Sequence, residues 1–116
     1  RVHSADVLSV DFSPDGGQLL TASEDFTAKL WCAASGELLR TVEGHGDVVW
    51  SAAFSPNGSH LATASEDCTA KIWCAASGAR LRTLEGHAEA VWSVAFSPDG
   101  RKLVTASADR TAPRLL

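Results

Sequence analysis

The chain of 116 residues lacks any apolar run near the ~20 residues that cross a bilayer, and residues 1–6 are too polar for a secretory signal. It also lacks a surplus of basic residues, because 14 acidic residues outnumber 10 basic ones and the arginines are scattered along the chain. The remaining composition is ordinary for a packed soluble fold. We therefore expect a cytoplasmic protein whose partners are neither nucleic acids nor membranes.

Spacings that bind metals or phosphates are missing as well. The sequence contains no Cys-x-x-Cys, no His-x-x-x-His and no glycine-rich phosphate loop, since each glycine belongs to a turn. These gaps predict that the protein uses no metal and no cofactor.

What the sequence does have is a repeat. Phe-Ser-Pro begins at residues 12, 54 and 96, a spacing of 42 residues, and histidine, threonine, aspartate and tryptophan positions recur at the same offset. The repeats are predicted at 1–42, 43–84 and, incomplete, 85–116. Two of the three cysteines, Cys32 and Cys74, are equivalent under this offset, which indicates packing positions with reduced thiols rather than a disulfide framework.

Turn chemistry divides each repeat into short strands. Ser-Pro-Asp/Asn-Gly begins at Ser13, Ser55 and Ser97, where proline suits the second place of a type I turn and glycine can adopt positive φ. Two further turns follow in the first repeat, near residues 23 and 33, and no stretch has helical spacing. Three turns predict four strands, at 7–12, 17–23, 27–32 and 37–43, with the later repeats displaced by 42 residues.

Residues 44–73 resemble one known family, the WD40 repeats. They contain Gly-His, Val-Trp-Ser-x-x-Phe-Ser-Pro, Leu-x-Thr-Ala-Ser-x-Asp and Thr-Ala-Lys-Ile-Trp in order. The resemblance covers essentially the whole chain and implies an all-β fold, a partial β-propeller of four-stranded antiparallel blades. One departure is that Cys32 and Cys74 replace the family's aspartate after the tryptophan.

The third repeat ends irregularly. Pro113 would remove a ladder donor from an inner strand, and Leu115 stands at the tryptophan position. We expect two full blades and an incomplete third that lacks a sound third strand. Because propellers need about four to eight blades to close, either the chain is a fragment of a longer protein or copies associate through open blade edges.

A histidine, a hydroxyl and a carboxylate recur in every repeat, as in nucleophilic catalysis. An active site is one asymmetric arrangement, however, so three copies indicate a scaffolding element instead. The WD40 resemblance implies that these residues form a buried hydrogen-bonded tetrad with the tryptophan. Ser23 and Ser65 share the strand face of the threonines and are alternative hydroxyls. The tetrad positions are His3, Thr21, Asp25 and Trp31, then His45, Thr63, Asp67 and Trp73, then His87, Thr105 and Asp109.

The first strand of each repeat spaces its apolar residues by three and then by two. The extra residue predicts a β-bulge that turns Leu8, Trp50 and Trp92 outward, although strict alternation would instead place the two tryptophans in the core. The resemblance implies a partner-binding face at these residues and their neighbours. The implied positions are Asp6, Leu8, Glu24, Val48, Trp50, Glu66, Ala90, Trp92 and Ala108.

The sequence thus predicts a non-catalytic scaffold of WD40 type that binds peptides or protein partners through the loop face of its blades. Its acidic and aromatic face favours basic or mixed peptides. The alternative is a structural or sensor array that self-assembles or completes a propeller within a larger multidomain protein. The repeated rather than unique polar sets disfavour an enzyme.

Overall fold

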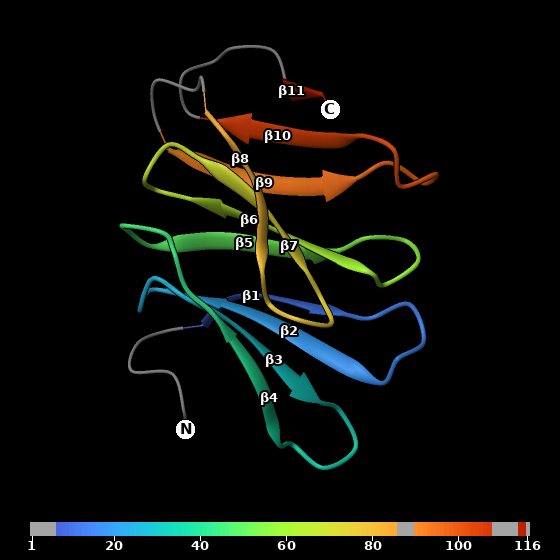
Figure 1. Ribbon diagram of the computed structural model, residues 1–116. Coiled ribbons are helices and arrows are strands. Elements are labelled where there is room, and N and C mark those ends of the chain that lie inside the picture. Colours follow the sequence, from blue (N-terminus) through green and yellow to red (C-terminus); the bar gives the residue numbers. More distant parts are fainter. Residues whose placement is uncertain (1–6, 86–89, 108–113, 116) are drawn as a thin grey trace.

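The computed structural model describes residues 7–85, 90–107 and 114–115 (Figure 1), with only the backbone described at 106–107 and 114–115. Within these ranges the chain forms eleven strands and no helix. The strands make three antiparallel sheets that are stacked side by side and do not close into a ring. The all-β prediction is confirmed, and we call the sheets the first, second and third blades.

The first two blades are complete and alike. The first has the order β1(Val7–Phe12), β2(Gln18–Ser23), β3(Ala28–Cys32) and β4(Leu38–Val42). The second has the order β5(Val49–Phe54), β6(His60–Ser65), β7(Ala70–Cys74) and β8(Arg80–Leu84). The four predicted strands of the first repeat are all present, and the last three begin one residue later than predicted.

The third blade consists of β9(Val91–Phe96), β10(Leu103–Ser107) and the two-residue β11(Arg114–Leu115). Leu115 pairs with Val104, whereas Trp73, at the same repeat position, pairs with Leu61, the equivalent of Leu103. The third strand is therefore short and shifted by one residue, as expected for an unsound strand. Pro113 lies outside the described residues.

Side-chain hydrogen bonds shape the turns between the first two strands. The Asp15 carboxylate accepts bonds from the Ser13 hydroxyl at 2.6 Å and from the Gly17 N–H at 2.8 Å. Gly16, at φ 74°, donates its N–H to the Ser13 carbonyl at 2.9 Å. The local sequence thus fixes the turn that ends β1 and starts β2.

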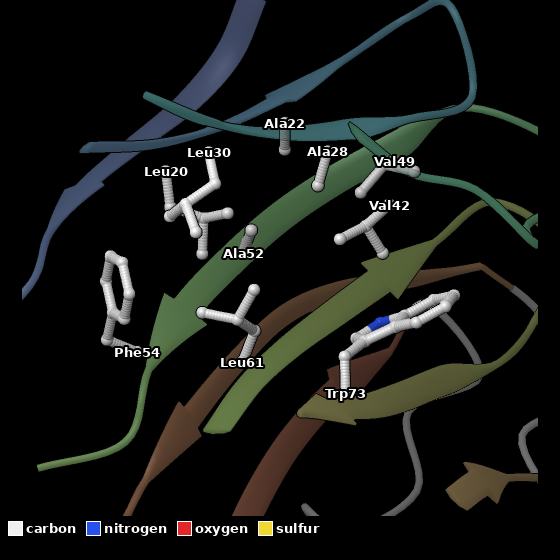
Figure 2. Packing of buried hydrophobic residues seen from close by; sticks show 10 residues of the cluster. All are labelled: Leu20, Ala22, Ala28, Leu30, Val42, Val49, Ala52, Phe54, Leu61 and Trp73. Carbon is white, nitrogen blue, oxygen red and sulfur yellow. The ribbon is translucent and has the colours of Figure 1, made fainter. Parts of the chain in front are cut away.

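The core lies between blades rather than inside one. Leu20, Leu30 and Val42 of the first blade pack with Phe54 and Leu61 of the second, and Figure 2 shows these side chains facing one another across the gap. Ala62, Ala64, Ile72, Val91, Val94 and Leu103 form the equivalent cluster between the second and third blades. Full burial of a valine, leucine or phenylalanine side chain contributes about 1.5–3 kcal/mol, so each blade depends on its neighbour.

Candidate functional site

Four polar side chains of the second blade meet in one hydrogen-bonded chain. His45 comes from the loop before β5, Thr63 from β6, Asp67 from the turn after β6 and Trp73 from β7. His45 Nδ1 lies 2.8 Å from Asp67 Oδ2, and His45 Nε2 lies 2.6 Å from Thr63 Oγ1. Trp73 Nε1–H donates to the same Thr63 oxygen at 3.0 Å. The group links these four segments on the side of the blade where the loop before β5 and the β6–β7 turn lie.

The pKa shifts of the group assign its protons. Burial lowers the pKa of His45 below 6.5, against the opposing effect of the Asp67 carboxylate. Burial alone would raise the pKa of Asp67, but hydrogen bonds from Thr69 and His45 hold it below 3.8. The ionised carboxylate can only accept, so Nδ1 of a neutral imidazole carries the proton. Nε2 then accepts from Thr63, whose oxygen accepts from Trp73.

The hydroxyl of Thr63 has a structural role in this arrangement. Thr63 is fully buried, and both its proton and its oxygen are engaged by neighbouring rings. Ser65, the alternative hydroxyl, instead donates to the Val48 carbonyl at 2.8 Å and accepts the Asp67 N–H at 3.1 Å. Thr63 therefore belongs to the hydrogen-bonded chain, whereas the Ser65 side chain holds the adjacent loop in place.

The first blade contains part of the same set. Trp31 Nε1–H donates to Thr21 Oγ1 at 3.0 Å. The Asp25 carboxylate accepts bonds from the Thr27 hydroxyl at 2.6 Å and the Thr27 N–H at 3.1 Å, as Asp67 does from Thr69. His3, the predicted fourth member, lies outside the described residues.

In the third blade only one predicted tetrad side chain is described. Thr105 is buried on β10, at the place that Thr63 has on β6. His87 and Asp109 lie outside the described residues.

The predicted β-bulge is confirmed in all three blades. The pairing of the first strand skips Leu8, Trp50 and Trp92, each opposite the end of the second strand. Trp92 is 56% exposed, while Leu8 and Trp50 are half-buried. Trp50 Nε1–H donates to Glu66 Oε1 at 2.6 Å, so the structure brings together two residues of the implied binding face.

The other implied face residues differ in exposure. Glu24 is exposed and Val48 is half-buried beside the bulge, where its carbonyl accepts the Glu66 N–H at 2.9 Å. Ala90, by contrast, is only 8% exposed and offers a partner little surface, because it leads directly into the buried start of β9. Asp6 and Ala108 lie outside the described residues.

A family model for the WD domain, G-beta repeat, matches three segments of the chain: 1–32, 36–74 and 78–112. The chain belongs to the WD40 repeat family. The second and third matches begin just before the first residues of β4 and β8. The second match therefore joins β4 to three strands of the second blade, and the third match joins β8 to β9 and β10 of the third blade. The predicted repeat boundaries after residues 42 and 84 coincide with the ends of the sheets instead, and they stay a prediction.

Relatives of this WD40 chain carry WD repeats in much longer proteins. Over 51 residues it is 43% identical to dynein assembly factor with WD repeat domains 1 of Xenopus laevis, which covers 44% of this chain. Over 45 residues it is 42% identical to proteasomal ATPase-associated factor 1 of Homo sapiens, which covers 39%. Over 47 residues it is 43% identical to human WD repeat-containing protein 86, which covers 40%. Each match spans 12% of the relative's length.

WD40 membership and the similarity to these relatives support a protein-interaction scaffold in general, and proteins of the WD40 family are generally non-enzymatic. In the described part of the chain, no three histidine, cysteine, aspartate or glutamate side chains gather closely enough to hold a metal ion. The same part has no helix with the length and apolar character needed to cross a membrane. The three cysteines are free thiols.

Proposed function

We propose that this WD40 chain binds protein partners through the loop end of its blades, with Trp50 and Trp92 as anchors. The observation that carries the proposal is the bulge at each tryptophan, because it takes these side chains out of the alternating pattern that buries their neighbours. Trp50 is held by its bond to Glu66, and Trp92 is largely exposed. Exposed tryptophan is among the residues most enriched at interface hot spots.

The charge beside the anchors favours a basic or mixed peptide. The Glu66 carboxylate accepts the indole N–H with one oxygen, and its exposed position leaves the second oxygen open to a lysine or arginine. Glu24 places a second exposed carboxylate at the equivalent position of the first blade. A cation near the indole face would add a cation–π contribution.

Substitution of the anchors tests this function. A peptide array that pairs lysine-rich and arginine-rich sequences with charge-reversed versions would identify a probe, whose affinity is then measured by fluorescence anisotropy. Trp92→Ala and Trp50→Ala should each weaken binding at least about tenfold, with circular dichroism unchanged for the exposed Trp92. Phe12→Ala is the matched control, because it removes a 61% exposed aromatic at the far end of β1. Equal losses in the control, or no loss in either tryptophan variant, would contradict the proposal.

A further inference from the structure

A basic hollow lies between the second and third blades. Its volume is about 190 Å³, and its apolar wall comes from Ile72 on β7, Leu81 on β8 and Phe96 on β9. Three cationic residues, Arg82, Arg101 and Lys102, line it together with His60 and Gly100. The turns β5–β6 and β9–β10 beside it lie at the end of the sheets opposite the β6–β7 turn that carries Glu66 (Figure 1), so the hollow is separate from the tryptophan face.

The charged groups of the basic hollow make no direct contact with a carboxylate in the described part of the chain. No side chain there forms a salt bridge or hydrogen bond with the guanidinium of Arg82 or Arg101 or with the ammonium of Lys102. The Asp99 carboxylate accepts the Ser97 hydroxyl at 2.5 Å and the Arg101 N–H at 3.0 Å within its own turn, and these bonds, with a smaller attraction from the Lys102 ammonium, hold its pKa below 3.8. Because the chain's net charge is −4, this gathering of positive charge runs against its average.

The preceding blade junction is an internal control. Arg40, the repeat equivalent of Arg82, donates to the Ser77 carbonyl at 2.8 Å and to the Ala76 carbonyl at 2.6 Å. The equivalents of Arg101 and Lys102 are Ser59 and His60. At these positions the junction of the first and second blades therefore has one cationic residue, whose guanidinium is already hydrogen-bonded, whereas the junction of the second and third blades has three.

The bonds of Arg40 also show what an arginine at this place binds. Its two terminal nitrogens donate to the backbone carbonyls of two successive residues, so a guanidinium at this place can bind two oxygens at once. A carboxylate also offers a guanidinium two oxygens, and at Arg82 it would add the negative charge that the neighbouring Arg101 and Lys102 attract.

We propose that the basic hollow binds an acidic peptide segment in which one large apolar residue is flanked by aspartate or glutamate. The apolar side chain enters between Ile72, Leu81 and Phe96, and the carboxylates meet Arg82, Arg101 and Lys102. The volume suits this occupant, because an apolar cavity of roughly 150 Å³ already accommodates benzene.

Binding of short synthetic peptides tests the proposal. The probe is labelled Glu-Glu-Phe-Glu-Glu, with Gln-Gln-Phe-Gln-Gln and Glu-Glu-Ala-Glu-Glu as comparisons and inorganic phosphate as competitor, all measured by fluorescence anisotropy. We expect the first peptide to bind at least about tenfold more tightly than either comparison, and phosphate to compete poorly. Equal binding of the alanine peptide, or efficient competition by phosphate, would reduce the hollow to a general anion site and overturn the proposal. Equal binding of the glutamine peptide would remove the role of the cations.

Variants then locate the site. Arg101→Gln and Lys102→Gln together should weaken the acidic peptide about tenfold, and both positions are exposed, so folding should persist in circular dichroism. The control is Gln18→Glu, which changes the equivalent of Lys102 in the first blade and lowers the net charge by the same amount as Lys102→Gln alone. Lys102→Gln should weaken binding severalfold and Gln18→Glu should not. The same loss in both single variants would show that only overall charge matters.

Discussion

The first strands of the first two blades have nearly the same sequence pattern and opposite surroundings. On β5, Ala52 is 4% exposed and Phe54 is 8% exposed, whereas their equivalents on β1, Val10 and Phe12, are 55% and 61% exposed. Both phenylalanines precede the same Ser-Pro turn. Burial in this fold is therefore decided by the preceding blade rather than by the strand's own residues.

The contacts across the first junction show what the preceding blade supplies. Leu20 and Leu30 of the first blade belong to the same buried cluster as Phe54 (Figure 2). Asp11 adds a polar link, because its carboxylate accepts the Phe54 N–H at 2.9 Å. The buried surroundings of Phe54 in the second blade are thus formed by residues of both blades, as expected for stacked repeats.

Removing each phenylalanine would test this difference most strongly. Phe54→Ala should lower the free energy of unfolding by about 3–5 kcal/mol, because a buried ring leaves a cavity among aliphatic side chains. Phe12→Ala should change it by less than about 1 kcal/mol, since the ring already meets water. Urea unfolding followed by tryptophan fluorescence measures both values. Similar losses at the two positions would mean that β1 is covered in solution.

Much of the fold was accessible from the sequence because its causes are local. The turns, the strand lengths and the bulge follow from residues that sit next to one another, as the bonds of Ser13 and Asp15 illustrate. The exposure of Phe12 does not follow from its own strand, because the local sequence matches that of the buried Phe54; it follows from the position of the blade in the repeat array.

The same distinction between local and non-local causes applies to the prediction of the sites. The tetrad positions recur with the repeat, but the choice between Thr63 and Ser65 depends on which hydroxyl reaches the rings, and both share one strand face. The basic hollow was missed because it joins residues of two blades. Its only signal in the sequence is that Arg101 and Lys102 depart from the repeat.

Acidification would act on the second blade through His45. Burial lowers the folded-state pKa of this histidine below 6.5, so the unfolded chain binds a proton more readily than the folded chain. Its contribution to stability is complete above pH 6.5 and falls as the pH drops from there toward the folded-state pKa. Asp67, whose pKa lies below 3.8, adds a further loss as the pH falls from about 3.8 through that lower value.

The measurement is the free energy of unfolding in urea at pH 7.5 and pH 5.5. Wild-type protein should lose stability over this interval, and His45→Gln should flatten the dependence, because glutamine does not titrate. His60→Gln removes a histidine outside the hydrogen-bonded chain and should keep the wild-type slope. An unchanged slope in His45→Gln would show that the buried imidazole does not govern the response.

The smallest predicted effect concerns a turn conformation that the first two blades have in common. Phe26 and Cys68 occupy equivalent turns with φ values of 74° and 73°, a left-handed conformation that costs a side chain about 1–2 kcal/mol relative to glycine. Glycine also gains entropy in the unfolded chain, so Phe26→Gly and Cys68→Gly should each stabilise the protein by at most about 1 kcal/mol. Thermal unfolding measures both. Because each turn is closed by its own aspartate and threonine, the two gains should have the same sign. A gain in the second blade alone would show that a preceding blade governs even the turns, extending to local geometry the dependence that Phe12 and Phe54 show for burial.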